Sequence, residues 1–130
     1  MDPKPPSEIP AIRVVMMPRD TNPQGTIFGG VLMSLIDQAA FIESMRQAPH
    51  RYVTVSMETI EFKQPVLVGD VLSLWAHTER VGRTSVRVRV DVRASRRGST
   101  SEIDVTSGVA TLVAVDANGT PVPVASEWTA

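Results

Sequence analysis

The chain has 130 residues, of which 13 are basic and 14 acidic, so its net charge is −1 and no strong field favours nucleic acid or anionic lipid. This length and a mean hydropathy of +0.01 suit one ordinary globular domain. There is no cysteine, which excludes disulfides and thiolate chemistry, and the two histidines, His50 and His77, lie outside any metal-binding spacing.

The first ten residues are rich in proline and polar side chains, and we expect residues 1–10 to form a disordered tail. They lack the apolar core of a signal peptide, and no apolar run in the chain approaches the roughly 20 residues that span a bilayer. We therefore expect a cytoplasmic protein. A first strand is predicted over residues 11–18, followed by a polar turn over residues 19–23.

One helix is predicted from about Gly29 to Gln47, and its segment Val31–Ile42 is hydrophobic nearly all the way round, which is typical of a buried helix. Asp37 is the only charged residue in that segment, and the residues three and four positions away carry no positive charge. Burying an unpaired carboxylate is costly, so such a group usually has a distant polar partner or a function. Asp37 is therefore the first candidate for a functional residue.

Four long segments of alternating apolar and polar residues follow the helix and predict strands over residues 52–63, 71–79, 86–93 and 103–115. The first changes phase near Glu58–Thr59, which indicates a β-bulge. One helix followed by strands that short turns connect indicates an α+β fold with an antiparallel sheet. A single sheet curled around this helix would cover only part of it, so we expect a dimer or a larger assembly.

Several blocks of the sequence resemble the acyl-CoA thioesterases of the hotdog superfamily, in particular the small bacterial hydrolases related to the cytosolic brain-type enzyme. The blocks are Asp20–Gly30 with Met33, Ser34 and Asp37, then Val53–Ser56, Phe62 with Pro65–Val66, Val68–Asp70, Val81–Ser85, Val113–Asp116 and Pro121–Pro123. The resemblance covers roughly residues 12–124. It implies a hotdog fold, in which an antiparallel sheet of about five strands wraps around one long central helix. A single hotdog thioesterase domain would then occupy residues 11–124, with a C-terminal tail at residues 125–130.

Members of this family pair two hotdog folds across edge strands, and the dimers commonly assemble into hexamers. The resemblance therefore implies a homo-oligomer built as a trimer of dimers, an acyl-CoA substrate, and neither nucleic acid nor membrane as a partner. Coenzyme A would enter as part of the substrate, with no separate cofactor. The family active site lies at the dimer interface and combines an asparagine and an aspartate from opposite protomers, which correspond by position to Asn22 and Asp37.

Thioester hydrolysis requires a group that stabilises the developing oxyanion and one that activates water or attacks directly. Backbone N–H groups at a helix start are unpaired and lie at the positive end of the helix dipole. Gly29 and Gly30 stand at that point without a Cβ to block a ligand. We predict that the N–H of Gly30 polarises the thioester carbonyl and that Gly29 belongs to the substrate-binding site. The alternative is that both glycines only permit a tight helix entry or close packing on the sheet.

Asp37 is the predicted general base, or else a nucleophile that forms a mixed anhydride. Its structural alternative is an aspartate that is hydrogen-bonded across the interface. Asn22 would orient the attacking water or the carbonyl, although asparagine before proline is also ordinary turn chemistry. Arg83, Thr84 and Ser85 follow a hairpin turn, and the resemblance places them near the phosphates of coenzyme A. Their alternative is a solvated turn.

Two other functions are considered. Hotdog dehydratases and hydratases use a histidine paired with a carboxylate, and residues 1–49 contain no histidine, so that chemistry is excluded. A non-catalytic module that binds acyl-CoA is the alternative function, although a pure binder has no need of a lone buried aspartate.

His50 follows the helix end and is expected at the surface, and Trp128 is a candidate for packing on a neighbouring subunit.

Overall fold

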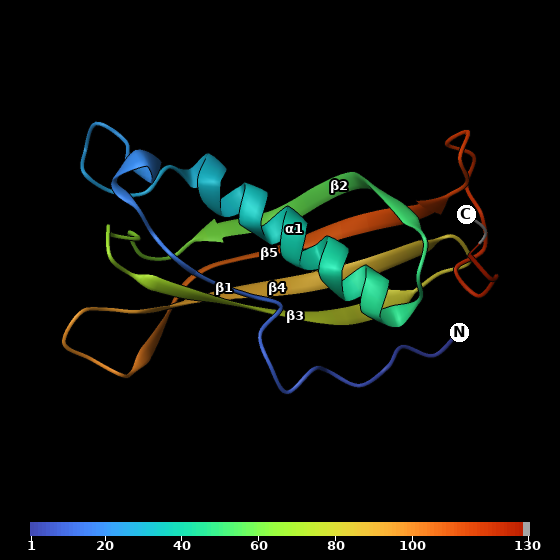
Figure 1. The fold of residues 1–130 in the computed structure, drawn as a ribbon, viewed down its shortest axis with the longest axis horizontal. Coiled ribbons are helices and arrows are strands. Elements are labelled where there is room, and N and C mark those ends of the chain that lie inside the picture. Colours follow the sequence, from blue (N-terminus) through green and yellow to red (C-terminus); the bar gives the residue numbers. More distant parts are fainter. Residues whose placement is uncertain (129–130) are drawn as a thin grey trace.

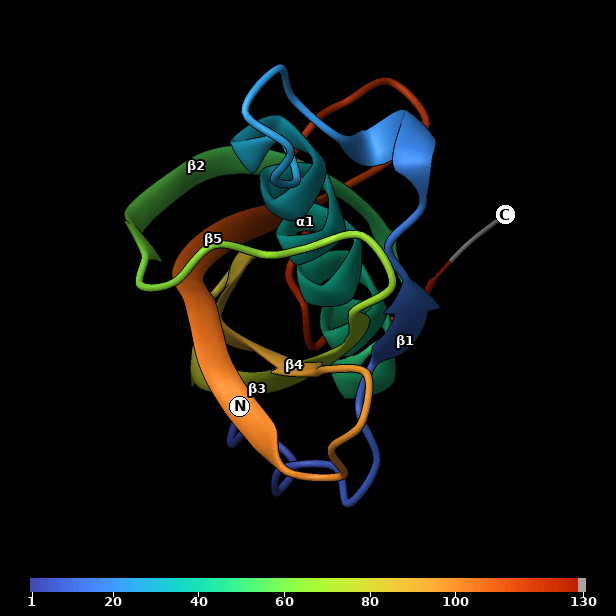
Figure 2. The ribbon, with the colours of Figure 1, turned by 90° about the vertical axis from the view of Figure 1, so that its left-hand side faces the viewer.

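The computed structural model describes residues 1–128, which form a helix packed against a curved sheet. In chain order the elements are β1 (Ile12–Val15), the short 3-10 helix η1 (Pro18–Asp20), α1 (Gly29–Gln47), β2 (Arg51–Phe62), β3 (Val71–Val81), β4 (Ser85–Ser95) and β5 (Glu102–Val115). The strands are antiparallel in the order β1-β3-β4-β5-β2. Figure 1 shows α1 lying across one face of the sheet, and Figure 2 shows the sheet curving around the helix. The predicted hotdog architecture is therefore confirmed.

Helix α1 begins and ends at the predicted residues. Leu32, Ile36, Ala39 and Ala40 are buried against the sheet, as expected for a helix in the core. Four apolar side chains on the other side are between 36% and 43% exposed, namely Met33, Phe41, Ile42 and Met45. A single protomer thus buries only one side of the helix, because one sheet can face only one side. The uncovered apolar stripe agrees with the expected assembly.

The strand pattern of the sequence is also present in the structure. Four valines of β4 are fully buried beneath the helix, at positions 86, 88, 90 and 92. The bulge predicted in β2 is confirmed, since its register against β5 shifts between Glu58 and Glu61, and Thr59 has a φ of 51°. A second shift, between Thr54 and Ser56, was not predicted.

Segments near each end of the described chain are hydrogen-bonded to other parts of the fold. Residues 1–10 form no helix or strand, and the Lys4 N–H donates to Gln47 Oε1 at 2.7 Å. At the other end the Val124 N–H donates to the Arg83 carbonyl at 2.8 Å. Of the predicted C-terminal tail, residues 129–130 lie outside the described part of the chain. No helix within residues 1–128 is long and apolar enough to cross a membrane.

Candidate active site

Asp37 lies on the side of α1 that faces the start of β2. Its Oδ1 accepts a hydrogen bond from the Thr54 hydroxyl at 2.5 Å, and it forms no ion pair with any of residues 1–128. These two side chains line a pocket together with Gln38, Phe41, Ile42 and Tyr52. Asp37 is half-buried in the protomer rather than buried, because this side of the helix is not covered.

Thr54 is a polar partner of Asp37 from a distant part of the chain, which was one of the outcomes considered for this carboxylate, but Thr54 itself was not predicted as a site residue. The sequence contains a pattern that could have identified Thr54. Tyr52 and Thr54 are two residues apart on β2 and point to the same side, which faces the helix, and a polar residue on that side is unusual. A hydroxyl that donates to one carboxylate oxygen fixes the orientation of the carboxylate and leaves its other oxygen for water or substrate.

The start of α1 presents two unpaired backbone donors. The N–H groups of Gly29 and Gly30 donate to no other residue within 1–128, as is normal for the first turn of a helix. A Cβ added at Gly29 would lie 3.2 Å from the Phe62 ring, whereas a Cβ added at Gly30 would meet nothing within 4 Å. Close packing therefore explains Gly29, and within the protomer it does not explain Gly30.

The Asn22 side chain organises the loop before the helix. Its Oδ1 accepts the backbone N–H groups of Gln24 at 2.9 Å and Thr26 at 3.1 Å. Its Nδ2 donates to the Thr26 hydroxyl at 2.8 Å. This is the turn chemistry weighed as the alternative for Asn22, and it leaves one amide hydrogen free for a ligand or a partner.

Arg83 and Thr84 lie in the turn between β3 and β4, and Ser85 is the first residue of β4. The Gly82 N–H donates to the Ser85 carbonyl at 2.8 Å, which closes a tight hairpin. The Arg83 side chain is exposed and forms no ion pair within residues 1–128. The turn therefore presents a guanidinium to solvent, as both the phosphate-binding interpretation and the solvated-turn alternative require.

The predicted site residues do not converge within one protomer. Gly30 and Asp37 lie on the same side of α1, since seven residues make almost two full turns, but they are about 10 Å apart along the helix axis. The helix start opens onto a different pocket, lined by residues that include Gly29, Leu32 and Phe62. Neither this pocket nor that of Asp37 is lined by Asn22 or by Arg83.

A buried polar cluster beneath the C-terminal half of α1 was not predicted. The Glu43 carboxylate is 2% exposed and accepts hydrogen bonds from Arg46 Nε at 2.7 Å, Gln47 Nε2 at 3.0 Å and the Thr78 hydroxyl at 2.8 Å. Burial by itself would raise the pKa of Glu43, but these three donors and the positive charge of Arg46 outweigh it, so this pKa is lowered. Its carboxylate oxygens are therefore occupied, which indicates a structural role.

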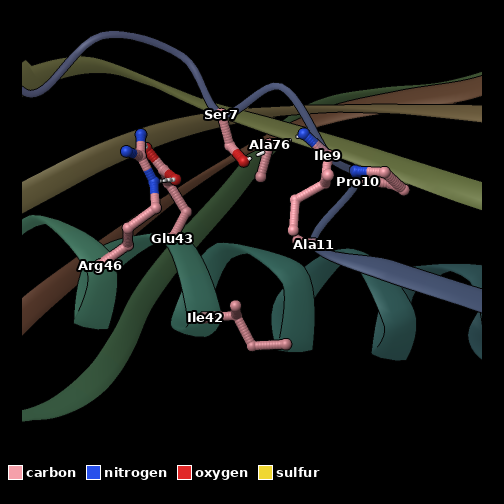
Figure 3. A pocket seen from close by; sticks show the side chains of 8 residues that line it. All are labelled: Ser7, Ile9, Pro10, Ala11, Ile42, Glu43, Arg46 and Ala76. Carbon is pink, nitrogen blue, oxygen red and sulfur yellow. Dashed lines mark hydrogen bonds and ion pairs between the residues drawn. The ribbon is translucent and has the colours of Figure 1, made fainter.

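The cluster borders a small cavity beneath the N-terminal segment. Figure 3 shows Glu43 and Arg46 at one side of it, with Ile9 and Ala11 opposite and Ile42 below. The Arg46 guanidinium also donates to the Pro5 carbonyl at 2.8 Å, so the same side chain holds the carboxylate and the N-terminal segment.

His50 is buried, which corrects the expectation of a surface residue. It is 3% exposed, and its Nε2–H donates to the Val124 carbonyl oxygen at 2.9 Å. The reason is that residues 122–124 return over this end of the sheet, a contact across more than 70 residues that no local pattern predicts. The neighbouring Tyr52 donates its hydroxyl to the Ala48 carbonyl at 2.7 Å, and burial raises the pKa of Tyr52 to about 12.

The chemistry available in the Asp37 pocket is that of a carboxylate, a hydroxyl and an amide. No group of three or more acidic or histidine side chains within residues 1–128 is arranged to hold a metal ion. A carboxylate with one free oxygen can accept a proton from water or attack a carbonyl carbon, and the unpaired N–H groups at a helix start can stabilise an oxyanion.

Comparisons with known proteins agree with this chemistry. Residues 24–101 match the family described as Thioesterase superfamily. An uncharacterized acyl-CoA thioester hydrolase of Zymomonas mobilis is 44% identical over 123 residues, which cover 95% of this chain and 83% of the relative. A hexameric hotdog fold thioesterase of Campylobacter jejuni superposes with a TM-score of 0.85 at 42% identity, covering 90% of each chain.

An acyl-CoA hydrolase of Staphylococcus aureus, solved in complex with butyryl coenzyme A and coenzyme A, is 31% identical with a TM-score of 0.81 and covers 91% of this chain and 71% of its own. Two variants of that hydrolase, in which an aspartate or a threonine is replaced by alanine, each have a TM-score of 0.80. The two replaced positions are 17 residues apart, the same separation as between Asp37 and Thr54.

Proposed function

The chain belongs to the thioesterase superfamily, and from this we propose that it is an acyl-CoA thioester hydrolase, which releases free coenzyme A and a carboxylic acid. The observation that carries the proposal is the Asp37 carboxylate, which the Thr54 hydroxyl orients in an open pocket and no basic residue of the described chain neutralises. No cofactor takes part, because coenzyme A enters as part of the substrate. The cytoplasmic location predicted from the sequence stays a prediction.

In the proposed reaction Asp37 accepts a proton from a water molecule that attacks the thioester carbonyl carbon. The negative charge that develops on the carbonyl oxygen is stabilised by the Gly30 N–H at the positive end of the helix dipole. When the carbon–sulfur bond breaks, the coenzyme A thiolate leaves and the proton from Asp37 neutralises it. The direct alternative, attack by the carboxylate itself, gives a mixed anhydride that water then hydrolyses.

Assembly would complete this site. Gly30 and Asp37 of one protomer lie about 10 Å apart along the helix axis, and the helix start and Asp37 line different pockets, so one protomer does not present both groups to the same thioester. We propose that the helix start and Asn22 of one protomer serve Asp37 of its neighbour, within dimers that associate as a trimer of dimers. The exposed apolar side chains on this side of α1 support such a contact, and they include Met33 at 39% and Phe41 at 43% exposure.

A thiol-release assay over a series of acyl-CoA substrates tests this function, and the cysteine-free chain contributes no background thiol. We expect Asp37→Ala to lower kcat by about 100- to 10,000-fold, the range typical for the loss of a general base. Asp104→Asn is the matched control, since Asp104 is an exposed carboxylate on β5 that pairs with Arg93 at 3.3 Å. Unchanged activity in Asp37→Ala would remove Asp37 from the mechanism. A wild type that binds coenzyme A without hydrolysing the thioester would instead favour the non-catalytic acyl-CoA-binding module.

A further inference from the structure

A second contact between α1 and β2 lies next to the hydrogen bond between Asp37 and Thr54. The rings of Phe41 and Tyr52 meet edge to face, with centroids 6.5 Å apart and an angle of 87° between their planes. Phe41 lies one helical turn after Asp37, about 6 Å along the axis. Tyr52 lies two residues before Thr54, about 7 Å along the strand. The two contacts therefore have matched spacing on the helix and on the strand, which run in opposite directions.

The Tyr52 side chain is held by both neighbouring elements. Within β2, which spans Arg51–Phe62, Tyr52 alone is buried, with 8% of its surface exposed. Its hydroxyl donates to the Ala48 carbonyl at 2.7 Å and so ties β2 to the end of α1. Its ring also meets the buried His50 ring edge to face, with centroids 6.0 Å apart. Tyr52 therefore acts as a fixed spacer between the helix and the strand.

Thr54 has little other support for its position. The register of β2 against β5 shifts between Thr54 and Ser56, so regular pairing stops directly after Thr54. The Thr54 side chain is exposed in the protomer, and its hydroxyl lies 2.5 Å from the Asp37 Oδ1. About 1 Å of added separation between α1 and β2 would bring this hydrogen bond to the limit of its range. The orientation of the Asp37 carboxylate therefore depends on the spacing of the two elements.

We infer that Tyr52 is a positioning residue, which sets the spacing at which the Thr54 hydroxyl reaches Asp37. This inference rests on the hydrolase function proposed above, in which Asp37 activates water. Tyr52 acts through Thr54, because its own hydroxyl is engaged by the Ala48 carbonyl. When the ring is lost, α1 and β2 change their separation, the hydrogen bond lengthens, and the carboxylate is no longer held in its reactive orientation.

A double-mutant cycle in kcat tests this inference. We expect Tyr52→Leu to lower kcat for an acyl-CoA about tenfold in the otherwise wild-type chain, with KM within about twofold of wild type. In a chain that carries Thr54→Val, the same substitution should lower kcat less than about twofold, because the hydrogen bond through which Tyr52 acts is already absent. Val92→Ala is the matched control, since Val92 is fully buried on β4, which does not pair with β2, and its effect should be the same in both chains.

Two kinetic results would overturn the inference. Equal losses of kcat from Tyr52→Leu in the wild-type and Thr54→Val chains would show that Tyr52 supports the fold in general and not this hydrogen bond. A raised KM with unchanged kcat would assign Tyr52 to substrate binding. If Tyr52→Leu does not fold, Tyr52→Phe replaces it in the cycle, with an expected loss of about threefold in the wild-type chain and no loss in the Thr54→Val chain.

A wild type that hydrolyses no acyl-CoA would refute the proposed function, and urea unfolding would then test the positioning role by itself. Tyr52→Phe removes the hydrogen bond to Ala48 in any chain. It should lower the urea midpoint of the wild type more than that of Thr54→Val, because only the wild type also has the hydrogen bond between Thr54 and Asp37 to lose. Equal shifts of the midpoint in the two chains would overturn the inference.

Discussion

Replacing Gly30 with alanine separates the catalytic use of the helix start from its role in folding. A Cβ at Gly30 meets no atom within 4 Å in the protomer, and Gly30 has no positive φ, so alanine can adopt this backbone without strain. At Gly29 the added Cβ would lie 3.2 Å from the Phe62 ring. The two adjacent glycines therefore provide a matched comparison, because close packing within the protomer explains the absence of a side chain at Gly29 but not at Gly30.

The expected effects of Gly30→Ala on stability and on activity have opposite signs. Alanine at an unstrained glycine position stabilises a protein by roughly 0.4–1 kcal/mol, which raises Tm by about 2–5 °C in a domain of this size. If the thioester carbonyl binds to the Gly30 N–H, the new methyl group displaces it, and the loss of one oxyanion donor lowers kcat by about 100- to 1000-fold. Gly29→Ala should change Tm little, because Phe62 is 53% exposed at the end of β2 and its ring can move.

Thermal unfolding and thiol release are measured on the same protein samples. A Gly30→Ala protein with wild-type kcat/KM would refute the reasoning, since the carbonyl could not then be bound at this N–H. A lower Tm accompanied by a smaller oligomer would show instead that Gly30 makes room for a neighbouring protomer. A larger loss of activity in Gly29→Ala than in Gly30→Ala would assign the oxyanion contact to the first glycine.

Three further outcomes follow from the contacts of the described residues. Thr54→Val should lower kcat about 10- to 100-fold, as expected for the loss of a hydrogen bond to a charged group, whereas Thr54→Ser should retain most activity. Equal values of kcat in the wild type and both variants would show that Thr54 does not orient Asp37. Tyr52 is the only tyrosine, so its ultraviolet titration should have a midpoint near pH 12 in the native protein and near pH 10 in urea. Its contribution to stability is complete below about pH 10 and is lost as the pH rises toward 12, and a native midpoint near 10 would contradict the buried phenol. The lowered pKa of Glu43 makes its contribution present above about pH 4.5 and lost as the pH falls through the lower native value. The urea midpoint of the wild type should therefore fall more steeply between about pH 6 and pH 3 than that of Glu43→Gln, and parallel curves would show that the cluster does not couple to folding.

Local chemistry made the elements predictable from the sequence. Glycines precede the apolar helix and Ala48–Pro49 follows it, so both ends of α1 are marked within a few residues. Strict alternation in β4 determines which side faces the core, and the phase change near Glu58–Thr59 locates a real bulge. These features depend only on neighbours in the chain, whereas the order of the strands, in which β2 pairs with β5 and not with β3, depends on contacts between distant segments.

The site was less predictable because its contacts join distant segments. Whether Thr54 faces Asp37 depends on the register of β2 against β5, and an unpredicted shift follows directly after Thr54. The partners of Glu43 include Thr78 on another element, and the burial of His50 requires a segment more than 70 residues away. A candidate residue could therefore be identified from the sequence, but the residue that forms a hydrogen bond with it could not.

One side of α1 connects the proposed reaction to the expected assembly. Gly30 and Asp37 lie on the side that the sheet leaves uncovered, and the apolar side chains of Met33 and Phe41 flank them. The same side borders β2, which is an edge strand of the sheet with unpaired backbone groups. A monomer would gain nothing from apolar side chains here, whereas a neighbouring protomer that covers them would also exclude water from Asp37 and bring a second helix start toward its carboxylate. The apolar stripe of the expected assembly and the carboxylate proposed for catalysis therefore share one surface. A substitution that weakens the contact between protomers should then reduce turnover even where it leaves Asp37 and Thr54 intact.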